Sequence, residues 1–480
     1  MLTAAIALNR FGLGARPTDA RPADPRRWLL DQFGSFQPRP LALASVPTRS
    51  AVIGQLSDYL AQARVDRRTR KQPQPASMTT GDAQQPPDRR ADPLRKFLRQ
   101  SIRDDYLTMN GARLDSALTS NTPFADRLVY FWANHFAVSV DKLPVIGLAG
   151  LLEFEAIRPH LFGRFSDMLL AVEQHPAMLL YLDQAQSIGP NSMVGQRVAA
   201  RQGKPRGLNE NLAREAIELH TLGVRTGYSQ TDVTEFARAL TGWTVNGIAR
   251  GPAARIVGGE PGEFRFAEGL HEPGDRIIMG KRYPQHGEAQ AKAVLLDLAA
   301  NPATARHVAT KLARHFAGDD PPQPMIDRLS RAYLASGGDL PTVYRALIDS
   351  PEVAAPAAVK FKTPWEWSVS ALRALGTDKL DPQMAAALLR QLGQPTWKPG
   401  SPAGWDDIAA SWAAPEALMR RVEVAQRLAA KAGSSVDARA LAEKVLPGVL
   451  SESTRTGIAR AESPEEGLAL LLVSPEFVRR

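Results

Sequence analysis

The chain has 480 residues, of which 44% are hydrophobic and 23% charged, the composition of a folded protein and not of a disordered one. It contains no cysteine, which excludes disulfides, thiolate nucleophiles and cysteine-ligated zinc. The net charge is +9, but most of the excess is scattered along the sequence, so a nucleic-acid partner is not expected.

Basic residues gather in one stretch only, between residues 64 and 103. The stretch lacks interleaved aromatic residues and flanks a low-complexity segment, which is typical of a solvated surface. Nucleic-acid binding through it is therefore the weakest of the functional hypotheses, testable by salt-dependent retention on heparin and DNA.

The sequence shows no segment that would cross a membrane, because no run approaches 18 apolar residues. Residues 1–10 are too short for a signal peptide and have no basic residue before the apolar run. We expect residues 4–8 to form the first folded helix. The compartment stays open, with the cytoplasm as the default.

Helical patterns follow along most of the chain. Asp24 before Pro25 is typical of a helix N-terminus, and apolar residues recur at spacings of three and four. Residues 72–92 lack this periodicity, so we expect a disordered surface loop there. The predicted helices span residues 25–33, 49–68, 93–120, 148–159, 163–174, 176–184, 209–222, 231–241 and 288–299, and another starts at Pro123.

Four places share a pattern in which an apolar helix ends at a polar residue and a proline follows. Proline disfavours the helical conformation of the residue before it and fits the first turn of a helix, so each place predicts a corner between two helices. Their irregular spacing argues against a solenoid. The four pairs are His175 and Pro176, Asn301 and Pro302, Ser350 and Pro351, and Ser474 and Pro475.

Residues 243–287 are rich in glycine and proline and do not follow a helical pattern. Alternation in 263–266 and a turn–strand–turn pattern in 271–283 predict a small β-hairpin or irregular excursion. The predicted fold class is all-α with this excursion. We expect one helical domain over residues 1–480, with an N-terminal lobe (1–242), the excursion (243–287) and a C-terminal lobe (288–480).

The strongest candidate site lies in the predicted helix 209–222. On an α-helix, Asn211, Glu215 and Glu218 fall at i, i+4 and i+7 and form one polar stripe. Two carboxylates one turn apart can share a metal or divide acid and base work. The alternative is that Arg214 and Glu218 form a surface ion pair while Glu215 faces water.

Two further segments carry polar groups suited to the same cleft. Asn134 and His135 stand among large aromatic residues, where a buried side chain needs a partner, although His135 could simply bond a core carbonyl. Asp183 ends another predicted helix. Such a cleft suits a divalent cation or a polyhydroxylated ligand. The candidate catalytic residues are Glu215, Glu218 and His135, and the candidate ligand-binding residues are Asn134, Asp183, Asn211, Arg214, His220 and Lys281.

Several motifs, in this order along the chain, resemble a bacterial family catalogued as domain of unknown function 1800. The resemblance covers essentially the whole sequence. The motifs are FWANHF (131–136), NENLARE (209–215), ELHTLG (218–223), TDVTEFARALTGW (231–243), HEPG (271–274), NPATAR (301–306), and LGQ (392–394) with GW (404–405).

The resemblance implies a large helical bacterial protein without established catalytic residues. Many relatives carry an export signal, which implies a periplasmic or exported location. They are often encoded beside a family similar to the sulfatase and alkaline-phosphatase superfamily, which implies a hydrolase as partner. Relatives usually have a run like Pro-Pro-x-Val-Lys where this chain has PGSPA (399–403), so a role of that loop need not carry over.

Two hypotheses for the function follow. The first is an interaction or scaffold protein that acts with a partner hydrolase in an envelope or polymer-related process; it predicts that alanine at Glu215 and Glu218 is tolerated. The second is a carboxylate-dependent hydrolase or lyase, with or without a metal, acting on a polysaccharide-like polymer. It predicts a cleft where Glu215, Glu218 and His135 converge and at least one shifted carboxyl pKa.

Overall fold

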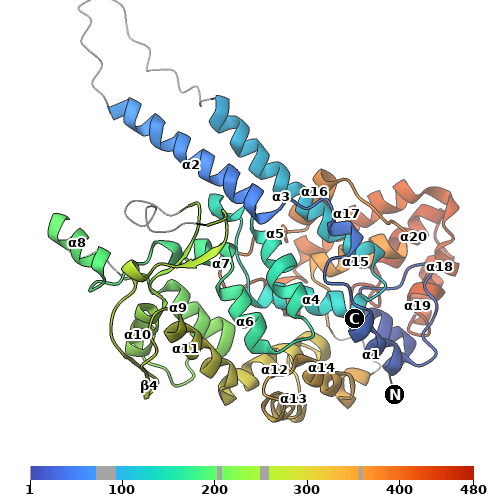
Figure 1. Cartoon of the computed structure of the whole chain (residues 1–480). Coiled ribbons are helices and arrows are strands. Elements are labelled where there is room, and N and C mark those ends of the chain that lie inside the picture. The colour runs from blue at the N-terminus through green and yellow to red at the C-terminus, as the bar shows by residue number, and fades with distance from the viewer. Residues whose placement is uncertain (1, 72–92, 203–207, 249–258, 356–359) are drawn as a thin grey trace, which may run out of the picture.

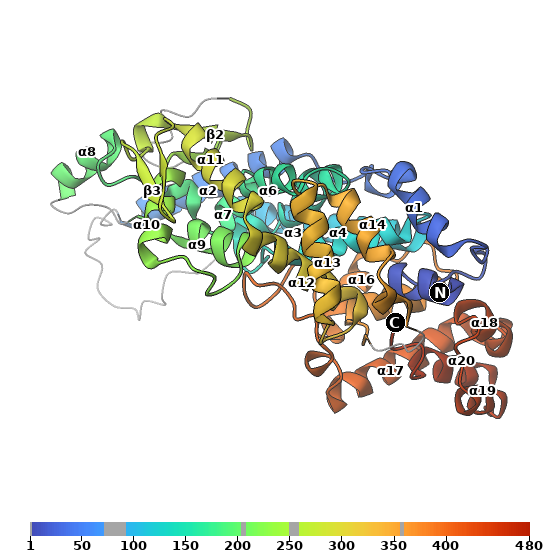
Figure 2. The same cartoon turned by 90° about the horizontal axis from the view of Figure 1, so that it is seen from below.

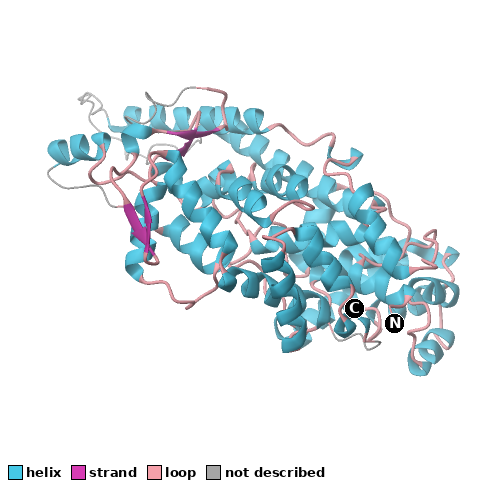
Figure 3. Ribbon diagram, turned by 60° about the horizontal axis from the view of Figure 1, so that its bottom comes forward, coloured by secondary structure: helices cyan, strands magenta, loops and turns pink. Residues whose placement is uncertain are grey.

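The computed structural model describes residues 2–71, 93–202, 208–248, 259–355 and 360–480, so the predicted loop 72–92 lies outside the described residues. Helices dominate the described chain (Figures 1 and 3), which confirms the predicted all-α class. The helices of the first half are α1 (Pro25–Ser35), α2 (Arg49–Lys71), α3 (Pro93–Thr119), α4 (Pro123–His135), α5 (Ala149–Leu151), α6 (Phe165–Glu173), α7 (Pro176–Tyr181), α8 (Met193–Gln202), α9 (Asn211–Glu215) and α10 (Gln230–Leu240). Those of the second half are α11 (Glu288–Ala300), α12 (Pro302–Ala317), α13 (Gln323–Ala335), α14 (Leu340–Ile348), α15 (Pro364–Ala374), α16 (Pro382–Gln391), α17 (Pro415–Ala432), α18 (Ala438–Val445), α19 (Glu452–Ala459) and α20 (Pro464–Val473).

The predicted β excursion is confirmed as two small antiparallel sheets between residues 243 and 283. Strand β1 (Trp243–Val245) pairs with β2 (Phe264–Phe266), and β3 (Arg276–Ile278) pairs with β4 (Lys281–Tyr283). Figures 2 and 3 place these strands at one end of the molecule, and Figure 2 shows helices α17 to α20 at the other.

Proline and side-chain caps explain where many helices begin. Asn301 caps α12 by accepting a hydrogen bond from the Ala303 amide at 2.9 Å, and Pro302 occupies the first turn. His175 and Pro176 start α7 in the same way. The predicted corners at these two places are therefore confirmed, and Pro351 opens a short 3₁₀-helix, Pro351–Ala354.

The predicted corner at Ser474 and Pro475 is wrong. After α20 the chain turns and runs extended beside residues 360–362. The Lys362 amide donates to the Val478 carbonyl at 2.9 Å and the Arg480 amide to the Lys360 carbonyl at 2.8 Å. These hydrogen bonds between distant segments outweigh the local preference of proline for opening a helix.

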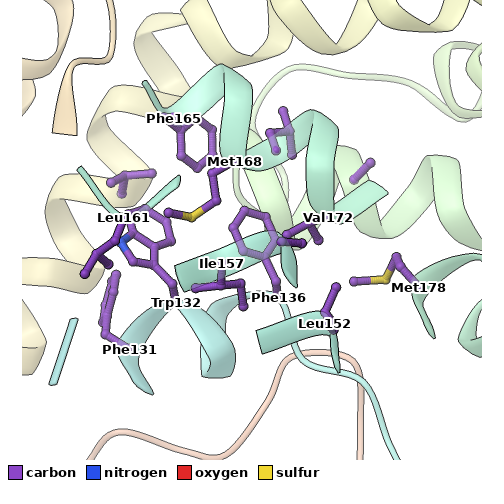
Figure 4. Packing of buried hydrophobic residues seen from close by; sticks show 14 of the residues in the cluster. Phe131, Trp132, Phe136, Leu152, Ile157, Leu161, Phe165, Met168, Val172 and Met178 are labelled. Atoms are coloured by element: carbon purple, nitrogen blue, oxygen red, sulfur yellow. The ribbon is translucent and has the colours of Figure 1, made fainter. Parts of the chain in front are cut away.

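The main hydrophobic core surrounds α4. Trp132 and Phe136 are completely buried and pack with Phe165 and Met168 of α6 (Figure 4). The Trp132 indole donates to the Tyr344 hydroxyl at 2.6 Å, which links α4 to α14. Aromatic side chains of two other helices, α6 and α14, thus fix the position of the C-terminal end of α4.

A second cluster joins α15, α17, α18 and α20 at the far end of the molecule. Leu8 and Ala15 of the N-terminal segment belong to it, and the Asn9 amide donates to the Val445 carbonyl at 3.1 Å. None of the described helices is both long and apolar enough to span a bilayer. The division into lobes at residues 243–287 stays a prediction.

Candidate functional site

The helix predicted over residues 209–222 is divided in the structure. An α-helical turn, α9, runs from Asn211 to Glu215, and a π-helical segment follows from Ala216 to Thr221. A π-helix bonds residue i to i+5, so side chains beyond Glu215 are rotated relative to an α-helix. The polar stripe predicted from an α-helical wheel therefore extends only to Glu215.

Glu218 forms the surface ion pair that was the alternative prediction. Arg214 lies 3.4 Å from Glu218 and 3.3 Å from Glu210, and it donates to the Gln230 side chain at 2.7 Å. Glu215 is half-buried, and burial raises the pKa of its carboxyl. The two carboxylates thus have different surroundings.

His135 is completely buried and bonds a backbone carbonyl. This is the alternative to a functional role that the sequence analysis described for it. Its Nε2 lies 3.1 Å from the His220 carbonyl oxygen, and Phe136 packs edge-on against its ring. Burial lowers the pKa of His135 well below its usual range, so the ring is neutral at pH 7. His220, also buried, bonds Glu173 through its Nδ1 at 2.6 Å.

Three of the other predicted residues have partners of their own or face solvent. Asp183 accepts from the Lys142 ammonium at 2.7 Å, Lys281 pairs with Asp297, and Asn211 is exposed. Among the described residues, no group of three or more histidines and acids is arranged to hold a metal ion. The divalent cation stays a hypothesis. Of the predicted residues, Asn134 alone lines the cavity described next.

A cavity of about 320 Å³ lies between α3, α4 and α12 and two later segments of the chain. Its volume is at the lower end of the range of about 300–1,000 Å³ common for small-molecule sites. The later segments are residues 363–366 and 394–408. The cavity therefore joins parts of the chain that are far apart in sequence.

An arginine surrounded by aromatic rings forms one part of the cavity. The Arg113 guanidinium carbon lies 4.2 Å from the ring centre of Trp365, 4.5 Å from that of Tyr130 and 5.5 Å from that of Trp397. Glu153 neutralises it through a hydrogen bond of 2.7 Å. The Tyr130 hydroxyl and the Trp365 indole N–H are buried without a hydrogen-bond partner among the described residues.

Two of the acidic side chains at the cavity are ion-paired. Glu366 pairs with Arg127 and, at 2.8 Å, with Arg480; Asp407 accepts from the His315 Nδ1 at 2.7 Å. Burial alone would raise the pKa of Glu366, but Arg480 and Arg127 hold it well below its usual range. His315 in turn lowers the pKa of Asp407 against the effect of burial. Both carboxylates are fixed negative charges and not proton donors.

Two cations of α12 remain without a carboxylate partner among the described residues. Lys311 and Arg314 are half-buried, stand three residues apart and line the cavity. The Arg314 Nε donates to the Asp319 carbonyl oxygen at 3.2 Å. Burial lowers the pKa of Lys311 to about 8, so at neutral pH it is mostly protonated.

Asn134 holds one rim of the cavity. Its amide nitrogen donates to the Trp405 carbonyl at 2.8 Å, and its oxygen accepts from the Trp405 amide at 2.7 Å. Gly404 has φ +84, and a Cβ there would lie 2.3 Å from the Asn134 carbonyl oxygen. Pro399 and Ala403, at the two ends of the PGSPA segment, line the cavity too.

The comparisons with known proteins agree with the motifs. The sequence model of the family described as "Protein of unknown function (DUF1800)" matches residues 6–479. The chain belongs to this family. The match confirms the resemblance and covers every segment that lines the cavity. No curated protein and no solved structure matches the chain.

Sequence reasoning missed most of the cavity. The signals available were weak: LGQ and GW stood out only as DUF1800 motifs, and they supply Gln394 and Trp405. Glu366 belongs to a capping box with Thr363, which alone predicts a helix start. Lys311 and Arg314 have no acidic residue four positions away in sequence, so neither can form an i,i+4 ion pair within its helix. This was the sequence signal that their charges could serve to bind a ligand.

Proposed function

We propose that the chain is a binding protein for a small anionic ligand that contains a ring, such as a sugar acid, and that the cavity beside α12 is the binding site. One observation carries the proposal: Lys311 and Arg314 line the cavity without a carboxylate partner among the described residues. The rings of Trp365, Trp397 and Trp405 supply flat surfaces for a sugar or aromatic ring.

A binding role suits this cavity better than hydrolysis by its two ion-paired carboxylates, Glu366 and Asp407. Arg127 and Arg480 hold Glu366 ionised, and the buried Lys360 does the same for Asp407. Neither carboxyl can therefore donate a proton to a leaving group. This supports the interaction-protein hypothesis, in which the chain acts with a partner hydrolase similar to the sulfatase and alkaline-phosphatase superfamily. The partner itself rests only on the family resemblance, and co-purification from the native organism tests it.

Calorimetry with purified protein tests the binding site. Glucuronate, glucose 6-sulfate and inorganic phosphate are compared with neutral glucose. We expect the charged sugars to bind at least about tenfold more tightly than glucose, because a partly buried ion pair contributes roughly 1.5–3 kcal/mol. Arg314→Gln should remove that preference.

Arg306→Gln is the matched control, because Arg306 is also on α12 but pairs with Asp327 on the exposed surface. It should leave binding unchanged. The proposal is wrong if no charged sugar or phosphate binds, or if Arg306→Gln weakens binding as much as Arg314→Gln does.

One observation favours the carboxylate-dependent hydrolase as a second candidate. Burial raises the pKa of Glu215, whereas its neighbour Glu218 is paired with Arg214. Two neighbouring carboxyls in different surroundings are what an acid and a base require. Release of reducing ends from acidic polysaccharides, lost in Glu215→Gln but retained in Glu210→Gln, would support this candidate.

A further inference from the structure

Lys311 differs from the other described cavity cations in what surrounds its amino group. Arg113 is neutralised by Glu153 and Arg127 by Glu366, but no described carboxylate lies within ion-pairing distance of Lys311. The negative charge of Asp407 raises the pKa of Lys311, but this carboxylate already contacts the His315 Nδ1 at 2.7 Å and the Lys360 ammonium at 3.1 Å.

The neighbours of Lys311 on α12 add no negative charge either. His307 lies four residues before it and Arg314 three residues after it, so all three side chains lie near one face of the helix. A lysine that is partly desolvated beside another cation loses its proton more readily and becomes a better nucleophile. The pKa of about 8 that burial gives Lys311 agrees with this geometry.

We propose that Lys311 is a reactive amine that forms an imine with an anionic carbonyl compound, an oxo acid or an acidic sugar with a free aldehyde, while Arg314 binds its anionic group. This inference rests on the proposed binding function and narrows the ligand class. Side chains three residues apart on a helix are about 5–6 Å apart at Cβ, close enough for one small molecule to reach both.

The chemistry needs no redox partner. The uncharged Nζ of Lys311 attacks the carbonyl carbon and forms a C–N bond. Proton transfers from nitrogen to oxygen then allow the carbonyl oxygen to leave as water, and the C=N bond forms.

Reductive trapping of the full-length protein tests the proposal. The protein is incubated with glyoxylate, an anionic aldehyde, or with neutral glycolaldehyde, in the presence of cyanoborohydride, and labelled lysines are located by peptide mass mapping. We expect glyoxylate to label Lys311 at least about tenfold faster than Lys292, a half-buried lysine paired with Glu288. Such an effect is typical of an activated amine that holds its substrate in place. Lys311→Arg, which keeps the charge, should abolish labelling at this position.

Two comparisons separate the two parts of the proposal. Arg314→Gln should slow labelling by glyoxylate about tenfold and change labelling by glycolaldehyde less than about threefold, because only glyoxylate has an anionic group to bind.

Lys362, whose pKa burial lowers to about 7, does not line the cavity and should stay unlabelled. Labelling at Lys362 instead of Lys311 would show that a low pKa, and not the cavity, determines reactivity.

The inference is overturned if glyoxylate labels Lys311 no faster than Lys292 in the wild-type protein, a result that does not depend on the folding of any variant. If glucuronate still binds in calorimetry, the proposed binding function survives that failure. If neither binding nor labelling is seen, both proposals fail. Equal slowing of both aldehydes by Arg314→Gln would overturn the role of Arg314.

Discussion

The imidazole of His220 and the carboxylate of Glu173 are joined by a hydrogen bond of 2.6 Å between Nδ1 and Oε1, with both side chains almost completely buried. Glu173 is the last residue of α6, and His220 belongs to the π-helical segment Ala216–Thr221. The π-turn therefore places a DUF1800 motif residue inside the protein, where it ties two helical segments together.

Replacing this carboxylate should cost stability. Glu173→Leu removes the acceptor and leaves the His220 Nδ1 buried without a partner, so we expect the free energy of unfolding to fall by about 2–3 kcal/mol. Glu173→Gln keeps an acceptor oxygen and should cost about 1 kcal/mol. Urea denaturation measures both. Glu218→Gln is the control, because its partly exposed pair with Arg214 should contribute less than about 1 kcal/mol.

The bond between Asn134 and Trp405 predicts how the cavity rim behaves. Asn134→Ala removes both hydrogen bonds to the Trp405 backbone, so residues 399–408 should exchange their amide hydrogens faster. Binding of glucuronate should weaken by about five- to tenfold, because the rim must be ordered again on binding. Hydrogen exchange and calorimetry measure the two effects.

Gly404→Ala gives an independent check on the same rim. Its Cβ would collide with the Asn134 carbonyl oxygen in a backbone conformation that suits glycine, so it should produce the same two effects without removing any side chain. Unchanged exchange in both variants would show that Asn134 does not order the rim.

The parts of the fold that local chemistry determines could be predicted from the sequence. Asn301 and Pro302 specify the start of α12 through a side-chain cap and a fixed φ, and the structure has both. Residues 475–480 could not be predicted in this way, because their conformation depends on hydrogen bonds to residues 360–362.

The candidate site was harder to predict for the same reason. Arg113 meets Trp365 and Trp397 only after α3 and the distant later segments have packed together, and no periodic pattern records that contact. The π-helical turn after Glu215 also cannot be seen in a sequence read with a period of 3.6 residues. Whether Glu215, Glu218 and His135 take part in catalysis stays a prediction.

The buried histidines predict sensitivity to mild acid. Burial lowers the pKa of His315 to about 4, whereas an unfolded chain protonates histidine near 6.5. Below pH 6.5 the unfolded state binds a proton that the folded state does not, so stability is full above 6.5 and is lost as the pH falls toward 4. Between pH 6.5 and 5 this one group should cost on the order of 2 kcal/mol.

Urea denaturation of the wild type and His315→Gln at pH 7, 6 and 5 measures the effect. The variant should be less stable at pH 7, since it loses the bond to Asp407, but its stability should fall less on acidification. His286→Gln, in an exposed loop, should follow the wild type. Parallel curves for wild type and His315→Gln would contradict the prediction.

Glu366 should be among the least replaceable residues of the chain. It is the shared counter-charge of Arg127 and Arg480, and all three side chains are buried. Glu366→Gln keeps the shape but leaves two buried guanidinium groups without a full negative charge, so the free energy of unfolding should fall by about 3–5 kcal/mol. Asp327→Asn, which breaks an exposed pair with Arg306, should cost less than about 1 kcal/mol.

A double mutant distinguishes the charge effect from a packing effect. Once Glu366 is neutral, Arg480 is an unpaired buried charge, so Arg480→Met should destabilise the Glu366→Gln variant less than it destabilises the wild type. The coupling between the two positions should exceed about 1 kcal/mol, as expected for a contacting pair in one ion network. If the losses in free energy of unfolding from Glu366→Gln and Arg480→Met simply add in the double mutant, Glu366 stabilises the protein through its packing and its cap on α15. The negative charge of Glu366 would then make no measurable contribution to stability.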